Sequence, residues 1–348
     1  MTAPLLAPHA HLAWRDTTRL VIEDPAAPHT QVLIGNASQA LVRWLRSCDG
    51  TRPLDAVLAQ APTLGIDAAS ARQVLETLGE AGLLGLDAPE PHQPRDVDAS
   101  ARPGVGQDLE ALSICGRNAA DTYRLRRAHH VWIDGTNRVA HALVDVLGAS
   151  HLGSLRVRAR GASTRPIALR DVGAFGPTDA DVGGAPSTAM RRHIARTAAG
   201  SSRAEGRAVA ISCDAHLDPS EEVAYREAGV PYLRVLATSR YATIGPLTLP
   251  GATVCWSCIA LHRTDADPQW PDLLAQFDQS RRSLAPIDSA FAMWVASETA
   301  SRLLQVIDGD DPSSLVNTTF HIDRNDPVVR RRTWRVHPDC PCQWRTAA

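Results

Sequence analysis

Two cysteine pairs are the residues of this chain best suited to chemistry. The first pair is Cys255-Trp-Ser-Cys258, and the second is Cys340-Pro-Cys342 close to the end of the sequence. Each CxxC or CxC turn can aim two sulfurs at one ion, and four thiolates around zinc leave no open position for water. The pattern therefore predicts a structural zinc (Zn) that ties the C-terminal segment to the body of the protein. Unrelated buried cysteines or a disulfide are the alternative.

The remaining cysteines, Cys48, Cys115 and Cys213, are scattered, and the total of seven is odd. An odd, scattered set argues against the disulfide framework of a secreted protein. The N-terminus carries no basic region followed by an apolar run, and no stretch reaches the roughly 18 apolar residues of a membrane span. We therefore expect a cytoplasmic protein with reduced thiols. A net charge of −2 gives no electrostatic basis for binding nucleic acid non-specifically.

Lysine is absent, since all 36 basic residues are arginine. This excludes a Schiff-base lysine, the lysine of a phosphate-binding P-loop and a lysine general base.

Composition divides the chain into two parts. Residues 89–107 are poor in large apolar side chains and rich in Pro, Gly and Asp, which is typical of a linker. The division predicts a domain over residues 1–88 and a second domain over residues 108–348.

The first domain has the pattern of a small winged helix. Short strands are predicted at 11–15, 18–23 and 31–34, followed by helices at 37–46, 53–60 and 68–82 with apolar residues at helical spacing. A winged helix often binds DNA, but the helix at 68–82 carries a single arginine, Arg72, beside Asp67, Glu76 and Glu80. Those carboxylates would repel phosphates, so a DNA-binding regulator is the weaker hypothesis.

A half-exposed strand beside an apolar helix can instead accept a peptide as an added strand. The strand would be formed by four residues, Gln31, Val32, Leu33 and Ile34. The wall of the groove would come from Arg72, Leu75 and Leu78, although each of these could equally be an ordinary core residue.

The alternating strand and helix patterns of the second domain predict an α/β, doubly wound sheet. Strands are predicted at 130–134, 155–158, 207–214, 231–236 and 242–247, with helices after the first strand and at 221–228. Further antiparallel strands are expected to complete the sheet, among them an edge strand at 330–335. A helix at 289–304 belongs either to the core or to a subunit interface.

The loop after the first strand of this sheet is where a nucleotide would bind. A phosphate loop needs several glycines so that backbone amides can approach a pyrophosphate, but this loop has only Gly135. The second strand ends in Arg158-Ala-Arg-Gly161 where a carboxylate would hold the ribose. The sequence therefore predicts a degenerate nucleotide site and makes ATP unfavoured as a cofactor. The alternative is that Arg138 and Asp214 still serve ATP and its magnesium.

Three segments carry a resemblance to a known family. The residues 208–215, 225–233 and 244–259 resemble the ThiF/MoeB family of ubiquitin-activating-type adenylating enzymes, whose paired cysteines hold a structural zinc. The stretch from Cys258 to Pro271, together with His337-Pro-Asp-Cys-Pro-Cys342, is similar to the ocin-ThiF-like partners of YcaO cyclodehydratases. In those proteins the N-terminal winged helix is a RiPP recognition element, which binds the leader of a ribosomally made precursor peptide.

The resemblance implies a division of labour. The YcaO partner would use ATP to activate a backbone amide, so that a Cys, Ser or Thr side chain closes to a thiazoline or oxazoline in azole-forming RiPP biosynthesis. This chain would bind the leader and present the core peptide without catalysing a step itself. The family commonly dimerises, so a homodimer is also expected. The hypothesis of another class is an active ATP-dependent adenylating enzyme that acts on a carboxylate or a peptide.

Overall fold

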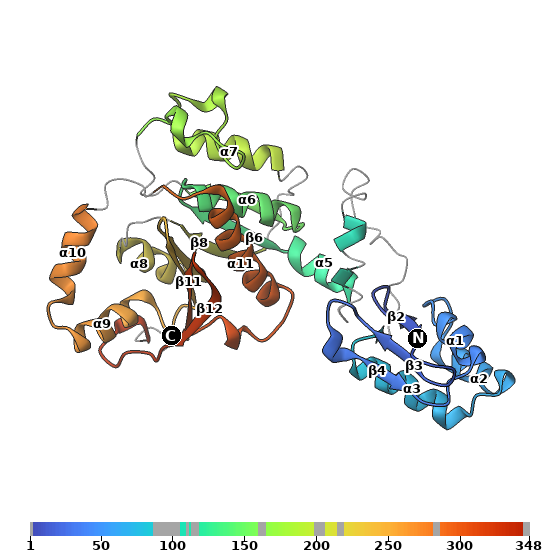
Figure 1. Ribbon diagram of the computed structural model, residues 1–348. Helices are drawn as coiled ribbons and strands as arrows, with labels where there is room; N and C mark the ends of the chain where they lie inside the picture. Colours follow the sequence, from blue (N-terminus) through green and yellow to red (C-terminus); the bar gives the residue numbers. More distant parts are fainter. Residues whose placement is uncertain are drawn as a thin grey trace. The chain divides into compact units, whose positions relative to one another are not determined.

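The computed structural model describes residues 3–85, 105–108, 111–112, 118–158, 165–197, 206–213, 219–280 and 286–343. The chain divides into two compact units, Met1–Tyr123 and Arg124–Ala348, and helix α5 (Ala119–Arg127) crosses the division (Figure 1). Most of the predicted linker lies outside the described residues, so the predicted domain limits stay a prediction. Within the described part, no helix is both long enough and apolar enough to cross a membrane.

The N-terminal unit contains a three-stranded antiparallel sheet and three helices. The sheet has the order β2-β3-β4, and a separate two-stranded sheet pairs β1 with β5. The strands are β1 (Leu5–Leu6), β2 (His11–Trp14), β3 (Leu20–Glu23), β4 (Val32–Ile34) and β5 (Leu84–Gly85), and the helices are α1 (Gln39–Arg46), α2 (Leu54–Gln60) and α3 (Ala68–Glu80). The three strands and three helices predicted from the sequence are confirmed. The β1–β5 pair was missed because two residues are too few to display an alternating pattern.

Local sequence explains where these helices begin. The Ser38 hydroxyl accepts a hydrogen bond from the Leu41 N–H, and the Asp67 carboxylate accepts one from the Ser70 N–H, so both side chains cap a helix N-terminus. Behind the caps, the apolar faces meet in one core around Trp44, whose indole N–H donates to the Val57 carbonyl at 2.9 Å. Burial of these faces holds the unit together.

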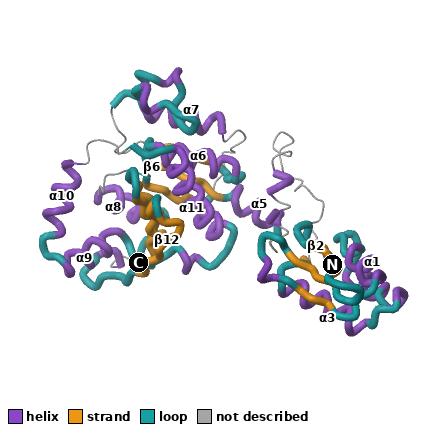
Figure 2. Tube along the Cα trace, viewed as in Figure 1, coloured by secondary structure: helices purple, strands orange, loops and turns teal. Residues whose placement is uncertain are grey.

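The C-terminal unit is built on a seven-stranded sheet with the order β12-β11-β10-β9-β8-β6-β7. Figure 2 shows strands of this sheet in orange with helices in purple around them. Strands β7, β6, β8 and β9 pair in parallel, and β10, β11 and β12 extend the sheet in antiparallel fashion. The strands are β6 (His129–Asp134), β7 (Ser154–Arg158), β8 (Arg207–Ser212), β9 (Tyr232–Ala237), β10 (Tyr241–Thr248), β11 (Thr318–Asp323) and β12 (Asp326–Thr333). The predicted α/β sheet with added antiparallel strands is thus confirmed, and β12 lies at its edge.

Helices cover both faces of the parallel part. On one face α6 packs against α11 and α7, and the main core includes Ile133, Ile211 and Leu233. On the other face a second cluster joins Tyr225 of α8 to Tyr232. The helices are α6 (Arg138–Ala149), α7 (Pro186–Thr197), α8 (Pro219–Glu227), α9 (Trp256–Ala266), α10 (Trp270–Ser280) and α11 (Ser289–Ile307). Helix α11, predicted at 289–304, has a buried face in the main core.

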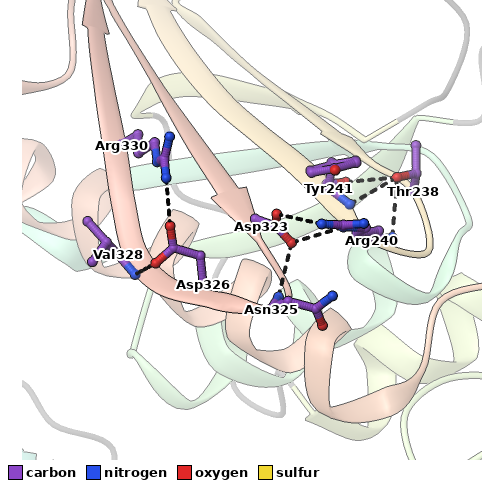
Figure 3. A network of polar contacts seen from close by, with 8 residues as sticks. All are labelled: Thr238, Arg240, Tyr241, Asp323, Asn325, Asp326, Val328 and Arg330. Atoms are coloured by element: carbon purple, nitrogen blue, oxygen red, sulfur yellow. Dashed lines mark hydrogen bonds and ion pairs between the residues drawn. The ribbon is translucent and has the colours of Figure 1, made fainter.

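A network of polar contacts lies at the antiparallel end of the sheet (Figure 3). Arg240, in the turn before β10, donates two hydrogen bonds of 3.2 Å to the two carboxylate oxygens of Asp323 at the end of β11. Asp326 accepts from the Val328 N–H at 3.0 Å and pairs with Arg330 at 2.9 Å. These bonds fix the turn between β11 and β12.

Leu78 allows a test of the N-terminal core. Its side chain is fully buried, so Leu78→Ala should destabilise the unit by about 2–5 kcal/mol through lost transfer energy and the cavity left behind. Gln73→Ala, at an exposed position of the same helix, should change the stability by less than about 0.5 kcal/mol. Hydrogen exchange of peptides from this unit, measured by mass spectrometry, reports both. Unchanged exchange in Leu78→Ala would contradict the core position.

Candidate functional site

The four cysteines predicted to bind zinc converge on one point. Cys255 and Cys258 lie at the N-terminus of α9, and Cys340 and Cys342 lie in the segment after β12. All four are buried, and their sulfurs lie within 4.8 Å of one another. The measured separations are 3.7 Å for Cys255–Cys258, 3.6 Å for Cys255–Cys340 and 3.5 Å for Cys258–Cys342. A zinc–sulfur bond of about 2.3 Å places tetrahedral thiolates about 3.8 Å apart, so the cluster could hold a metal ion.

The surroundings of the cluster favour a thiolate at Cys258. The hydrogen bond donated by the Cys255 thiol lowers the pKa of Cys258 to about 4. The N–H of Cys258 donates to the Cys255 sulfur at 3.4 Å, and Cys255 caps the positive end of α9. Several buried thiolates repel one another unless a cation neutralises them, which is the charge balance that a bound metal supplies.

A carboxylate from another helix supports this cluster and was missed by the sequence analysis. Glu222 of α8 accepts hydrogen bonds from the Trp256 N–H at 2.9 Å and from the Tyr232 hydroxyl at 2.6 Å. Its second oxygen accepts from the Ser257 hydroxyl at 3.0 Å. Glu222 therefore fixes the first turn of α9, between the two cysteines of the first pair.

A row of aligned polar side chains crosses the four parallel strands, at the carboxyl ends of β6, β7 and β8 and in the middle of β9. Strand register aligns Asp134 with Arg158 on one side and with Ser212 on the other, and Ser212 is aligned with Arg234. Asp134 is fully buried, and Ser212 and Arg234 are also buried. Ligands of doubly wound sheets bind at this end of the strands. The sequence shows which side chains of each strand share a face. It does not show which strands are neighbours, so the row could not be predicted.

Aromatic rings face both arginines of the row. The Arg158 guanidinium lies 4.2 Å from the centre of the Trp132 ring, and the Arg234 guanidinium lies 5.0 Å from that of Trp256. These are cation–π distances. Arg158 stands where a ribose-binding carboxylate would be expected, and its guanidinium is stacked on the Trp132 ring of the same chain.

The predicted nucleotide loop connects β6 to α6. Gly135 has φ of 122°, a conformation that favours glycine, and Asn137 caps α6 by accepting from the Ala140 N–H at 2.9 Å. The Asn137 amide also donates to the Cys213 carbonyl. Arg138 donates to the Ile287 carbonyl at 3.1 Å, and its guanidinium would lie 3.3 Å from a β-carbon at Gly173. Asp214, the third residue predicted here, lies outside the described residues.

The residues predicted to bind a peptide separate into two groups. Gln31, just before β4, is exposed. On β4 itself Leu33 is exposed and Val32 and Ile34 are half-buried, and Arg72 is exposed on α3. Leu75 and Leu78 have exposed fractions of 3% and 0% and belong to the core, so a bound peptide would not reach them. This corrects their assignment to the groove wall. Helical spacing identified an apolar face but not which of its positions remain at the surface.

A chain of polar groups, two buried histidines and a half-buried aspartate, links α6 to α7. The Nδ1 atoms of His141 and His193 are hydrogen-bonded at 2.9 Å. His193 Nε2 donates to the Asp145 carboxylate at 2.7 Å. Burial, with a smaller contribution from His193, lowers the pKa of His141 to about 3. Sequence reasoning missed this group because its members come from segments far apart in the chain.

A hollow of about 310 Å³ lies at the antiparallel end of the sheet, beside the exposed side chains of Tyr241 and Val328. Figure 3 shows these two side chains close to the polar network. The hollow lies on β10, β11 and β12, and not at the ends of the parallel strands.

The sequence by itself has no match: no protein-family model fits it, and no curated protein resembles it. Solved structures do resemble it. The fold is that of MccB. The microcin C7 biosynthetic enzyme MccB in complex with N-formylated MccA superimposes with a TM-score of 0.72 at 14% identity over 98% of this chain and 99% of that one.

Two further structures extend the comparison. MccB of E. coli with ATP has a TM-score of 0.70 at 14% identity over 97% and 99% of the two chains. PaaA has a TM-score of 0.62 at 13% identity over 93% and 98%. These similarities are similarities of fold, and they agree with the α/β architecture expected from the sequence.

His141 predicts a pH dependence of stability. Its pKa of about 3 in the folded chain lies below the ordinary 6.5, so the unfolded chain takes up a proton that the folded chain does not. The contribution of His141 to the free energy of unfolding is therefore fully present above pH 6.5 and is lost as the pH falls toward 3. Between pH 7.5 and pH 5 this loss amounts to about 2 kcal/mol. His141→Gln, which can still hydrogen-bond His193 but takes no proton, should flatten this part of the profile, whereas His29→Gln at an exposed site should not. Denaturant titrations across pH measure the difference; equal slopes would contradict it.

Proposed function

We propose that the chain binds the leader of a ribosomal precursor peptide and presents the core of that peptide to a YcaO cyclodehydratase for thiazoline or oxazoline formation. The observation that carries this proposal is the edge of β4. Within the described residues, β4 pairs with β3 alone, so one row of its backbone N–H and C=O groups faces no other strand. An added peptide strand would satisfy those groups.

The side chains of β4 suit this role. Val32 and Ile34 are half-buried and pack against the core of the unit, whereas Leu33 is 46% exposed on the other face. A strand laid beside β4 would place alternate side chains next to Val32 and Ile34, which gives both affinity and selection. Arg72 on α3 is exposed and would contribute polar contacts to the leader.

The C-terminal unit supports a partner role rather than a catalytic one. Its loop has a single glycine, Arg138 is engaged by the backbone carbonyl of Ile287, and no lysine exists to hold a phosphate. The physical work of such a partner is to raise the effective concentration of a weakly bound core peptide at another active site.

The second candidate is an ATP-dependent adenylating enzyme. It is favoured by the fold, because MccB has been crystallised with ATP, and by the buried carboxylate of Asp134 beside the loop that begins α6. In that case Arg138 and Asp214 would contact the nucleotide and its magnesium.

A matched pair of variants tests the peptide edge. Leu12 and Val32 are both half-buried and flank Ile22 in one row of the sheet, so Val32→Ser and Leu12→Ser remove similar apolar contacts from opposite edges. Val32→Ser should weaken leader binding at least about tenfold, which is 1.4 kcal/mol, and Leu12→Ser should leave it within about threefold. Fluorescence polarisation of the full chain with labelled leader peptides, encoded by precursor genes beside its own, measures this.

ATP–pyrophosphate exchange runs in parallel with the binding measurement. Leader binding at β4 without exchange supports the partner role. Equal losses in both variants would remove β4 as the site, and exchange without leader binding would replace the proposal with the adenylating enzyme.

We also propose that the four-cysteine cluster holds one structural zinc. Cys340→Ser should lose this ion and lower the melting temperature of the C-terminal unit, because the segment after β12 would be released from α9. Cys48→Ala, which alters a buried thiol of the N-terminal unit, should keep the ion. Elemental analysis with thermal unfolding reads both outcomes. A metal-free wild-type protein would refute the assignment.

A further inference from the structure

A second group of metal-binding side chains lies beside the cysteine cluster. His262 and Asp265 stand one turn apart on α9, and His337 precedes Cys340 in the C-terminal segment. One donor atom from each residue lies within 4.8 Å of the other two. We propose that these three side chains bind a second divalent transition-metal ion of the zinc class, separate from the ion of the four cysteines.

The donor set fits such an ion. Two imidazoles and one carboxylate are ligands that zinc accepts, and they leave a fourth position for water. His337 Nε2 lies 2.8 Å from an Asp265 oxygen, and the rings of His262 and His337 meet edge to face with centres 4.8 Å apart. The Asp339 carboxylate, 4.0 Å from His337 Nδ1, adds negative charge next to the site.

Exposure distinguishes this site from the cysteine cluster. The His337 side chain is 4% exposed, which holds one ligand in place, whereas the Asp265 side chain is 65% exposed. An ion here would exchange with solvent, while the four cysteines are closed to water. We therefore expect weaker binding and easier removal by a chelator.

The two sites join the same two segments of the chain. Helix α9 begins at the first cysteine pair and carries His262 and Asp265 farther along, and the C-terminal segment carries His337 before the second pair. His262 Nε2 also lies 2.8 Å from the Arg335 carbonyl oxygen. A second ion would thus fasten the C-terminal segment along α9 and not only at its first turn.

Conservative substitutions can remove the ligands while keeping the hydrogen bonds. In His262→Gln the amide can still donate to the Arg335 carbonyl, and in Asp265→Asn the amide oxygen can still accept from His337. Asp272→Asn, on the neighbouring helix α10, makes the same charge change away from the site.

The test is a metal count on the full-length protein. After equilibrium dialysis against Zn²⁺, elemental analysis should find two equivalents in the wild type and in Asp272→Asn, and one equivalent in His262→Gln and Asp265→Asn. Mild chelation should remove the second equivalent first. One equivalent in the wild type, if bound to the cysteines, or two in both ligand variants would overturn the proposal.

Cobalt separates this inference from the zinc assignment. Co²⁺ bound by thiolates shows a sulfur-to-metal charge-transfer absorption, which an imidazole–carboxylate site lacks. If the ligand variants keep that absorption but lose one equivalent, they are folded and the second site is the one removed. If the wild type binds Co²⁺ without that absorption and His262→Gln abolishes binding, the second site stands while the cysteine assignment fails.

Discussion

Parallel pairing of four strands is the constraint on which the C-terminal unit depends. It places the helices α6 and α8 on opposite faces of the sheet, so that each strand contributes alternate residues to two cores. The same register aligns Arg158, Asp134, Ser212 and Arg234 in one row across the parallel strands. In this row the buried carboxylate of Asp134 lies between Arg158 on one side and Ser212 followed by Arg234 on the other. Both arginines face aromatic rings of the chain.

Contacts around α9 bring together parts of the chain that are distant in sequence. Its first turn holds two cysteines, is fixed by Glu222 of α8, and meets two more cysteines from the C-terminal segment. Among the described strands, β12 lies at the sheet edge and pairs only with β11, so the segment that follows it depends on these contacts for its position. An ion held by the four cysteines would therefore stabilise the fold by fastening this segment to α9, and would have no open position for a substrate.

The N-terminal unit combines a packed core with a strand, β4, that pairs on one side only within the described residues. Its core includes Leu75 and Leu78, which the apolar pattern of α3 had also suggested for a peptide groove. The edge of β4 that faces no other described strand is a different kind of surface, because a peptide bound there would pair with backbone groups that core packing cannot satisfy. A peptide-binding function can therefore coexist with a tightly packed core.

Sequence alone determined many of the local elements of this protein and singled out the four cysteines that could hold a metal ion. Apolar spacing identified the strands and helices of the N-terminal core and the four parallel strands of the large sheet, but not β11, α9 or α10. The CxxC and CxC turns identified four cysteines that the fold brings together. Both signals lie within a few residues of the sequence. Tertiary structure decided what those elements contact: that Leu78 points inward, that Glu222 caps α9, and that His262 meets His337. Such contacts join residues far apart in the chain, and they are selected by packing and strand order, which periodicity does not encode.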